Sequence, residues 1–247
     1  MVVEGSPDIG GSRASMCLMA AETLGVEYAD VRAQVGDTES TGFCNVTGGS
    51  RTTFATGMAV TQACEDVIAD CKRRAAMTWG LDEDQVEWED GQAIPGPGVN
   101  ADVKPLSLAE LAGKAAKTGG PIQGRASLNA QGAGASFSVN FADIRVDRET
   151  GKVDVLSYTA VQDAGKAIHP AYVEGQMQGG AAQGLGWALN EEYIFDEEGI
   201  LQNAGFLDYR IPVASDLPMI DTHIVEVANP SHPFGVRGVG ETPIVAP

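Results

Sequence analysis

Apolar and polar residues alternate with two different periods in the first part of the chain. Between Ser12 and Leu24 the apolar residues recur every three or four positions, which predicts a helix, and Gly25 is a suitable residue to end it. Residues 31–35 alternate instead, which predicts a short strand. This opening therefore favours a fold that mixes helices with strands.

The helical periodicity of apolar residues resumes after a loop rich in Gly, Ser and Thr at residues 36–53. A long helix is predicted to end near Trp79, before Gly80, with Lys72, Arg73 and Arg74 complementing the helix dipole. Farther along, Ser107 and Glu110 have the spacing of a capping box, which predicts a short helix through Lys117. Two glycines and a proline at 119–121 then predict a domain boundary.

The second half of the chain begins with two strand patterns and continues with a helix. Alternation in residues 137–141 changes phase before Ile144, which predicts a bulge, and a second strand should carry Val153 and Val155. A helix is predicted from Pro170 to about Leu189, followed by a turn at 196–199 and a strand near 220–227. The predicted fold class is α+β, with two subdomains of mixed sheets and packed helices, residues 1–120 and 121–247.

Composition and charge narrow the classes of function. The 247 residues suffice for one or two domains, and 31 glycines indicate many tight turns or close approaches of the backbone. The net charge of −18 argues against nucleic acid and anionic membranes as partners. No apolar run approaches the roughly 18 residues of a membrane span. The four cysteines have no metal-ligand or disulfide spacing, which favours a reduced, cytoplasmic protein.

A Gly-Gly-Ser-Arg motif occurs twice, at Gly10–Arg13 and at Gly48–Arg51. Each precedes a predicted helix, where unpaired N–H groups and the helix dipole favour an anion, and Arg adds a fork suited to phosphate. The alternative is that Ser12 and Ser50 are ordinary N-caps and the arginines are solvated. The sequence leaves both readings open.

The segment from Glu174 to Trp187 is unusually rich in glycine for a helix. Each glycine weakens a helix by about 0.5–1 kcal/mol, so close packing or a ligand must compensate.

Farther on, Glu241 lies in a Gly-flanked turn before a proline. Partial burial there would raise the pKa of its carboxyl toward the range of a general base. The three histidines have no metal spacing, and no metal ligand is assigned.

Together these segments resemble the molybdopterin-binding large subunit of the xanthine dehydrogenase/aldehyde oxidase family of molybdenum hydroxylases. The resemblance covers nearly the whole chain, falls in the C-terminal half of that subunit, and extends to bacterial carbon monoxide dehydrogenase large chains. The stretches that carry it are Gly5–Arg13, Asp37–Thr53, Gln162–Pro170, Glu174–Gly186 and Gly238–Glu241.

The resemblance implies a role for each matching residue. Glu241 corresponds to the family's glutamate beside molybdenum, the general base that takes a proton from a metal-bound hydroxyl while its oxygen attacks an electron-poor carbon. Gln183 is expected near the dithiolene and oxo ligands. The implied cofactor-binding residues are Gly10, Gly11, Ser12, Arg13, Thr47, Ser50, Arg51, Thr52, Gln183, Gly184, Gly186, Gly238 and Gly240.

The family also implies partners. We expect molybdopterin in its cytosine dinucleotide form, and electron transfer through 2Fe-2S clusters and FAD. These would lie on a small iron–sulfur subunit and a medium FAD-binding subunit of an oligomeric complex. The family's large subunit is several times longer, so we expect this chain to be a fragment that is inactive alone.

Two departures from the family limit these expectations. Many relatives carry Gly-Gln-Gly where this chain has Gly10-Gly11-Ser12, and the cysteine-bearing loop of a true carbon monoxide dehydrogenase has no counterpart here. The substrate stays open among purines, aldehydes, N-heterocycles and carbon monoxide. The alternative function is a non-enzymatic binding module for a phosphate-bearing heterocycle.

Overall fold

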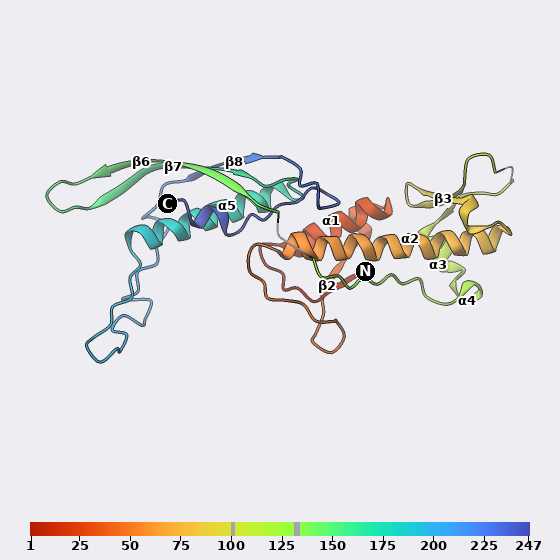
Figure 1. The fold of residues 1–247 in the computed structure, drawn as a ribbon, viewed down its shortest axis with the longest axis horizontal. Helices are drawn as coiled ribbons and strands as arrows, with labels where there is room; N and C mark the ends of the chain where they lie inside the picture. Colours follow the sequence, from red (N-terminus) through yellow and green to blue (C-terminus); the bar gives the residue numbers. More distant parts are fainter. Residues whose placement is uncertain (100–101, 131–133) are drawn as a thin grey trace. The chain divides into compact units, whose positions relative to one another are not determined.

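The computed structural model describes residues 1–99, 102–130 and 134–247, and the chain forms two compact units (Figure 1). The first unit comprises residues 1–47 and 55–131, and the second comprises 48–54 and 132–247. Both contain helices and sheets, which confirms the predicted α+β class. The predicted division at residue 120 does not anticipate that residues 48–54 join the second unit.

The helices of the first unit begin and end close to their predicted positions. Helix α1 (Ser12–Leu24) ends at Gly25, and α2 (Gly57–Trp79) ends at Gly80, with both glycines left-handed as the C-cap rule requires. The Ser107–Glu110 capping box is present and starts α3 (Leu108–Gly113), which α4 (Ala115–Thr118) follows. Helices α1 and α2 pack against each other.

Two small sheets complete the first unit. Strand β1 (Val2–Glu4) pairs in parallel with β2 (Ala33–Val35). Strands β3 (Val86–Glu89), β4 (Gln92–Pro95) and β5 (Leu106–Ser107) form an antiparallel sheet that packs on α2. The core between this sheet and the helices contains Cys71, Ala75, Ala76, Val86, Ala93, Leu106 and Leu111.

The second unit is a three-stranded sheet covered on one face by a single helix. Strand β6 (Phe137–Val146) pairs antiparallel with β7 (Val153–Asp163), which pairs in parallel with β8 (Ile220–Val225). Helix α5 (Pro170–Leu189) connects β7 to β8 (Figure 1). The core between helix and sheet contains Tyr158, Ala160, Met177, Ala181, Leu185 and Ile220.

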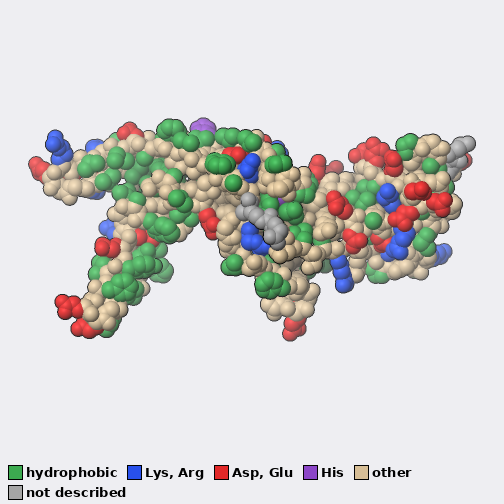
Figure 2. All heavy atoms as spheres, viewed as in Figure 1, with side chains coloured by type: hydrophobic (Ala, Val, Ile, Leu, Met, Phe, Trp, Pro, Cys, Tyr) green, Lys and Arg blue, Asp and Glu red, His purple; other side chains and the backbone are tan. Residues whose placement is uncertain are grey.

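The predicted bulge is confirmed by a register shift between Asp143 and Ile144. The extra residue belongs to the partner strand, because the register passes from Ser157 to Val155 and leaves Leu156 unpaired. The opposite face of the sheet exposes apolar side chains, visible in Figure 2, among them Phe137, which is 68% exposed.

Some local expectations about side chains are wrong. Ser12 is not an N-cap: Gly11 holds that position and the Ser12 hydroxyl donates to the Pro7 carbonyl. Arg74, expected to complement the dipole of α2, lies outside the last turn of that helix and is buried, with hydrogen bonds to Asp70 and to the chain after α4. The Ser12 contact is local, whereas the Gly120 carbonyl that Arg74 binds lies 46 residues farther along the chain. All four cysteines are free.

Strand β1 places a carboxyl group in the interior of the first unit. Glu4 is 5% exposed, and neither of its carboxyl oxygens has a hydrogen-bond partner among the described residues. Burial, reinforced by the charge of Asp8, raises the pKa of Glu4 to about 7. Folding therefore favours the protonated form of this side chain.

This buried carboxyl predicts a stability that falls as the pH rises. Because the pKa is higher in the folded chain than the usual 4.5, the folded state binds more protons between those values. The loss should begin near pH 4.5 and be complete above pH 7, with a size of about 3 kcal/mol. Glu4→Gln should therefore be the more stable protein at pH 8 and equal to the parent at pH 4.

Urea unfolding at several pH values measures this difference. The matched control is Glu39→Gln, a change at an exposed glutamate of the same unit, which should leave the pH dependence unaltered. If Glu4→Gln and its parent respond to pH in the same way, the burial of this carboxyl does not govern the acid–base behaviour of the unit.

Candidate functional site

In the second unit, Gly49 and Ser50 of the Gly-rich loop contact Glu241. The Gly49 N–H donates to Glu241 Oε1 at 3.1 Å, and the Glu241 N–H donates to Ser50 Oγ at 2.9 Å. These residues lie 192 and 191 positions apart in the sequence. The Gly-rich loop therefore holds both the side chain and the backbone of the predicted base.

The loop achieves this contact through an uncommon backbone. Gly49 and Ser50 both have positive φ angles, 66° and 54°. For serine this conformation costs about 1–3 kcal/mol, which the surrounding contacts must offset. Of the two readings left open for Ser50, the ordinary N-cap is not the one found: a π-helical turn at Thr52–Thr56 runs directly into α2, and Ser50 lies two residues before it. Its hydroxyl accepts the Glu241 N–H instead.

The burial expected of Glu241 is not found in this chain. Its side chain is exposed, although Oε1 accepts the Gly49 N–H. The 3-10 turn at Thr242–Ile244 that follows it packs against α5. The packing thus fixes where the carboxylate stands without removing it from solvent.

Two glycines before Glu241 that the resemblance singles out have close neighbours. A Cβ atom on Gly238 would lie 3.0 Å from Ser50 Cβ, and one on Gly240 would lie 2.9 Å from Gln176 Oε1. Both distances are shorter than ordinary van der Waals contact. The chain before Glu241 is therefore packed tightly between the Gly-rich loop and α5.

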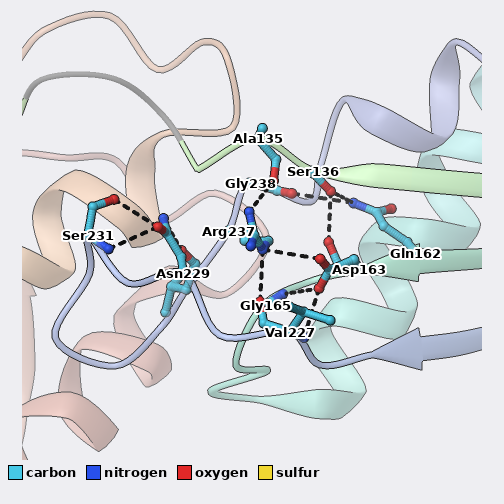
Figure 3. Close-up of polar contacts among 11 residues, drawn as sticks. Ala135, Ser136, Gln162, Asp163, Gly165, Val227, Asn229, Ser231, Arg237 and Gly238 are labelled. Carbon is cyan, nitrogen blue, oxygen red and sulfur yellow. Dashed lines mark hydrogen bonds and ion pairs between the residues drawn. The ribbon is translucent and has the colours of Figure 1, made fainter.

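The segment that leads to Glu241 is anchored by an ion pair that sequence reasoning missed. The Arg237 guanidinium lies 3.2 Å from Asp163 Oδ2 and donates to the carbonyls of Val227 and Ala135 (Figure 3). Asp163 also accepts the N–H groups of Gly165 and Val227. Asp163 lies within the Gln162–Pro170 stretch that carries the family resemblance, and Arg237 directly precedes the Gly238–Glu241 stretch; that was the available signal.

The glycines of α5 divide into two groups. Gly184 and Gly186 face other parts of the chain closely, since a Cβ would meet Ile244 O at 2.4 Å and Glu191 Oε1 at 2.3 Å. Packing therefore accounts for these two. Gly175 and Gly179 have no atom near an added Cβ, and Gln183, four residues beyond Gly179, is exposed. This side of α5 is open to a ligand.

The first Gly-Gly-Ser-Arg motif lies in the first unit and is organised differently. Gly10 and Gly11 have positive φ angles, and the Asp8 carboxylate accepts the Arg13 backbone N–H at 3.0 Å and pairs with its guanidinium at 2.6 Å. The Arg13 N–H groups, the backbone one first, lower the pKa of Asp8. A side chain of the protein itself therefore occupies the position at which an anion was expected. Thr47 also belongs to the first unit.

The open loop suits a flat anionic cofactor better than a metal ion held by side chains. A Cβ on Gly48 or Gly49 would meet no described atom within 4 Å, so a planar group has room to approach the backbone. Arg51, which follows, adds a positive charge suited to phosphate, whereas Thr52 is buried. Among the described residues no three His, Cys, Asp or Glu side chains are placed to hold a metal ion. Within the same residues no helix is long and apolar enough to cross a membrane.

Comparison with known proteins identifies the family of this chain. A family model described as a molybdopterin cofactor-binding domain matches residues 1–218. A putative xanthine dehydrogenase molybdenum-binding subunit of Escherichia coli K12 is 31% identical over 99% of this chain and 33% of its own length. The carbon monoxide dehydrogenase large chain of Hydrogenophaga pseudoflava is 27% identical over 95% of this chain and 30% of its own length.

Solved structures give the same picture. Carbon monoxide dehydrogenase from Oligotropha carboxidovorans matches with a TM-score of 0.86 and 25% identity, over 99% of this chain and 31% of that one. Quinoline 2-oxidoreductase from Pseudomonas putida 86 matches with a TM-score of 0.83 and 29% identity, over 98% and 31%. The chain thus spans about a third of the length of these relatives.

The family model that matches this chain is that of a molybdopterin cofactor-binding domain. The chain belongs to the molybdopterin cofactor-binding domain family, and subunits of xanthine dehydrogenase and carbon monoxide dehydrogenase are among the proteins similar to it.

Proposed function

We propose that this chain is the cofactor-binding part of a molybdenum hydroxylase and that Glu241 is its general base. The observation that carries the proposal is a pair of hydrogen bonds: the Gly49 N–H donates to the Glu241 carboxylate, and the Glu241 N–H donates to the Ser50 hydroxyl. They hold the carboxylate beside an open glycine-rich loop. A base must lie within hydrogen-bond reach of the proton that it removes, and a carboxylate fixed at the edge of the cofactor loop meets that condition.

Each part of the site then has a task. The loop residues Ser50, Arg51 and Thr52 hold the phosphates, and the Gln183 amide on the open side of α5 contacts the cofactor near the metal. Glu241 accepts the proton at its carboxylate. When bound, the molybdenum cofactor supplies the two-electron redox chemistry that adds water-derived oxygen to an electron-poor carbon.

The further proposals concern the whole protein. We propose the cytosine dinucleotide form of the cofactor, 2Fe-2S and FAD partner subunits in an oligomeric complex, and a cytoplasmic location. We propose that Gly10, Gly11, Ser12, Arg13 and Thr47 also bind the cofactor, with Arg13 exchanging the Asp8 carboxylate for an anionic group of the ligand. The 247-residue chain by itself should be inactive, because Glu241 is exposed and its loop is open.

Cofactor content is the direct test. The complete subunit, purified from a host that synthesises molybdopterin, should contain about one molybdenum atom per chain by mass spectrometry, with pterin detected by fluorescence. A folded subunit without molybdenum and pterin would contradict the enzymatic proposal and favour the binding module.

A matched pair of variants tests the loop. Gly49→Val should lose most of the molybdenum, because a β-branched side chain suits neither the φ of 66° nor a planar ligand on the backbone. Gly151→Val changes a glycine with a φ of 74° in the β6–β7 turn, also without close neighbours, and should retain the metal. Equal molybdenum content in the two variants would exclude the Gly48–Thr52 loop as the cofactor cradle.

A further inference from the structure

A buried glutamine on β7 contacts the backbone immediately before Glu241. Gln162 is 1% exposed and lies on the face of the sheet that α5 covers. Its Nε2 atom lies 3.1 Å from the Val239 carbonyl, 3.4 Å from the Gly238 carbonyl and 3.0 Å from Ser136 Oγ. Figure 3 shows the side chain reaching from β7 toward Ser136.

These contacts define the orientation and the task of the amide. Two of the three neighbours of Nε2 are carbonyl oxygens, which only accept, so the NH2 group must face them. The Gln162 oxygen is buried and has no hydrogen-bond partner among the described residues. A buried, unpaired acceptor costs about 1–3 kcal/mol, so an apolar side chain would serve better if packing were the only requirement.

The carbonyls that Gln162 holds belong to a segment with little freedom to move alone. Gly238 packs against Ser50, and Gly240 packs against Gln176. The Arg237–Asp163 ion pair fixes the chain just before them. A shift of the Gly238 and Val239 peptides would therefore be passed to Glu241 and to its hydrogen bonds with the Gly49–Ser50 loop.

We propose that Gln162 is a positioning residue for the general base: its amide, by binding the Gly238 and Val239 carbonyls, fixes where the Glu241 carboxylate stands. The inference rests on the proposed role of Glu241 and adds the residue that holds it in place. A misplacement of about 1 Å in a catalytic group reduces turnover about 100-fold, so loss of this contact should be visible in kcat.

Hydrogen exchange tests the contact without relying on activity. In the complete, cofactor-loaded subunit, Gln162→Met keeps the length of the side chain and removes the donor. The Glu241 N–H, which Ser50 accepts in the parent, should exchange about tenfold faster or more. The matched control is Asn203→Leu, which removes another buried amide of this unit, one that donates to the Glu192 carbonyl. The control should leave exchange at residues 239–241 unchanged.

A conservative variant separates positioning from packing. Gln162→Glu keeps the shape and, when protonated, has one O–H that can donate to the Val239 carbonyl, whereas its ionised form repels both carbonyls. Protection at residues 239–241 should therefore be close to the parent's at low pH and be lost as the pH rises. A purely structural role predicts no such recovery at low pH. This variant also serves if Gln162→Met does not fold.

Turnover distinguishes the two proposals. With a panel of purine, aldehyde and N-heterocycle substrates, Gln162→Met should reduce kcat about 10- to 100-fold with little change in KM and in molybdenum content. Parent-like exchange and parent-like kcat in Gln162→Met would overturn the positioning role. If the parent itself has no turnover, the proposed function fails, and the exchange data still decide whether Gln162 holds the loop.

Discussion

Glu241→Gln should reduce kcat by about 100- to 10,000-fold in the complete subunit, the range over which general bases contribute. The amide keeps the length of the side chain and an oxygen that can accept the Gly49 N–H, so the loop and the bound cofactor should be undisturbed. What the variant lacks is the ability to take up a proton. Molybdenum content should therefore equal the parent's, and the loss should appear in turnover alone.

The measurement compares steady-state kcat with molybdenum content for parent and variant over the same substrate panel. Glu197→Gln, at an exposed glutamate in the 196–199 turn of the same unit, is the matched control and should be fully active. Undiminished turnover in Glu241→Gln would remove Glu241 from the mechanism. A parallel loss of turnover and molybdenum would assign it to cofactor binding instead.

Arg74→Met should destabilise the first unit by about 3 kcal/mol. The guanidinium is 2% exposed and pairs with Asp70 at 2.8 Å. It also donates to the carbonyls of Gly120 and Pro121, which ties the chain after α4 to α2. The variant leaves these carbonyls without the Arg74 donor, and among the described residues Asp70 keeps the exposed Arg73 as its ion-pair partner. Breaking a buried network is costly for that reason.

Urea unfolding followed by tryptophan fluorescence measures this effect, because Trp79 and Trp88 pack against the core of the first unit. Arg73→Met is the natural control: it removes a positive charge from the same turn of α2, but from an exposed side chain, and should leave the midpoint unchanged. If both variants shift the midpoint equally, burial of Arg74 does not set its contribution.

The sequence by itself determined the local structure of this protein. Helices Ser12–Leu24 and Pro170–Leu189, the left-handed glycines that end the first two long helices, and the Ser107–Glu110 capping box all follow from neighbouring residues. The relevant interactions span three or four positions, so the pattern of the chain contains them completely. The order of the motifs likewise sufficed to indicate the family, which the family model confirms.

Only the tertiary structure decided which residues meet. It brought the Ser50 hydroxyl to the Glu241 N–H, which lies 191 positions farther along the chain. It also brought Gln162 to the Val239 carbonyl, paired Arg237 with Asp163, and buried Arg74. It also separated glycines that pack, such as Gly184, from those that stay open, such as Gly179. Such contacts depend on how distant segments fold together, and a residue's type and neighbours do not encode that. Ser50, for example, fits an N-cap by its sequence, whereas in the structure its hydroxyl accepts the Glu241 N–H.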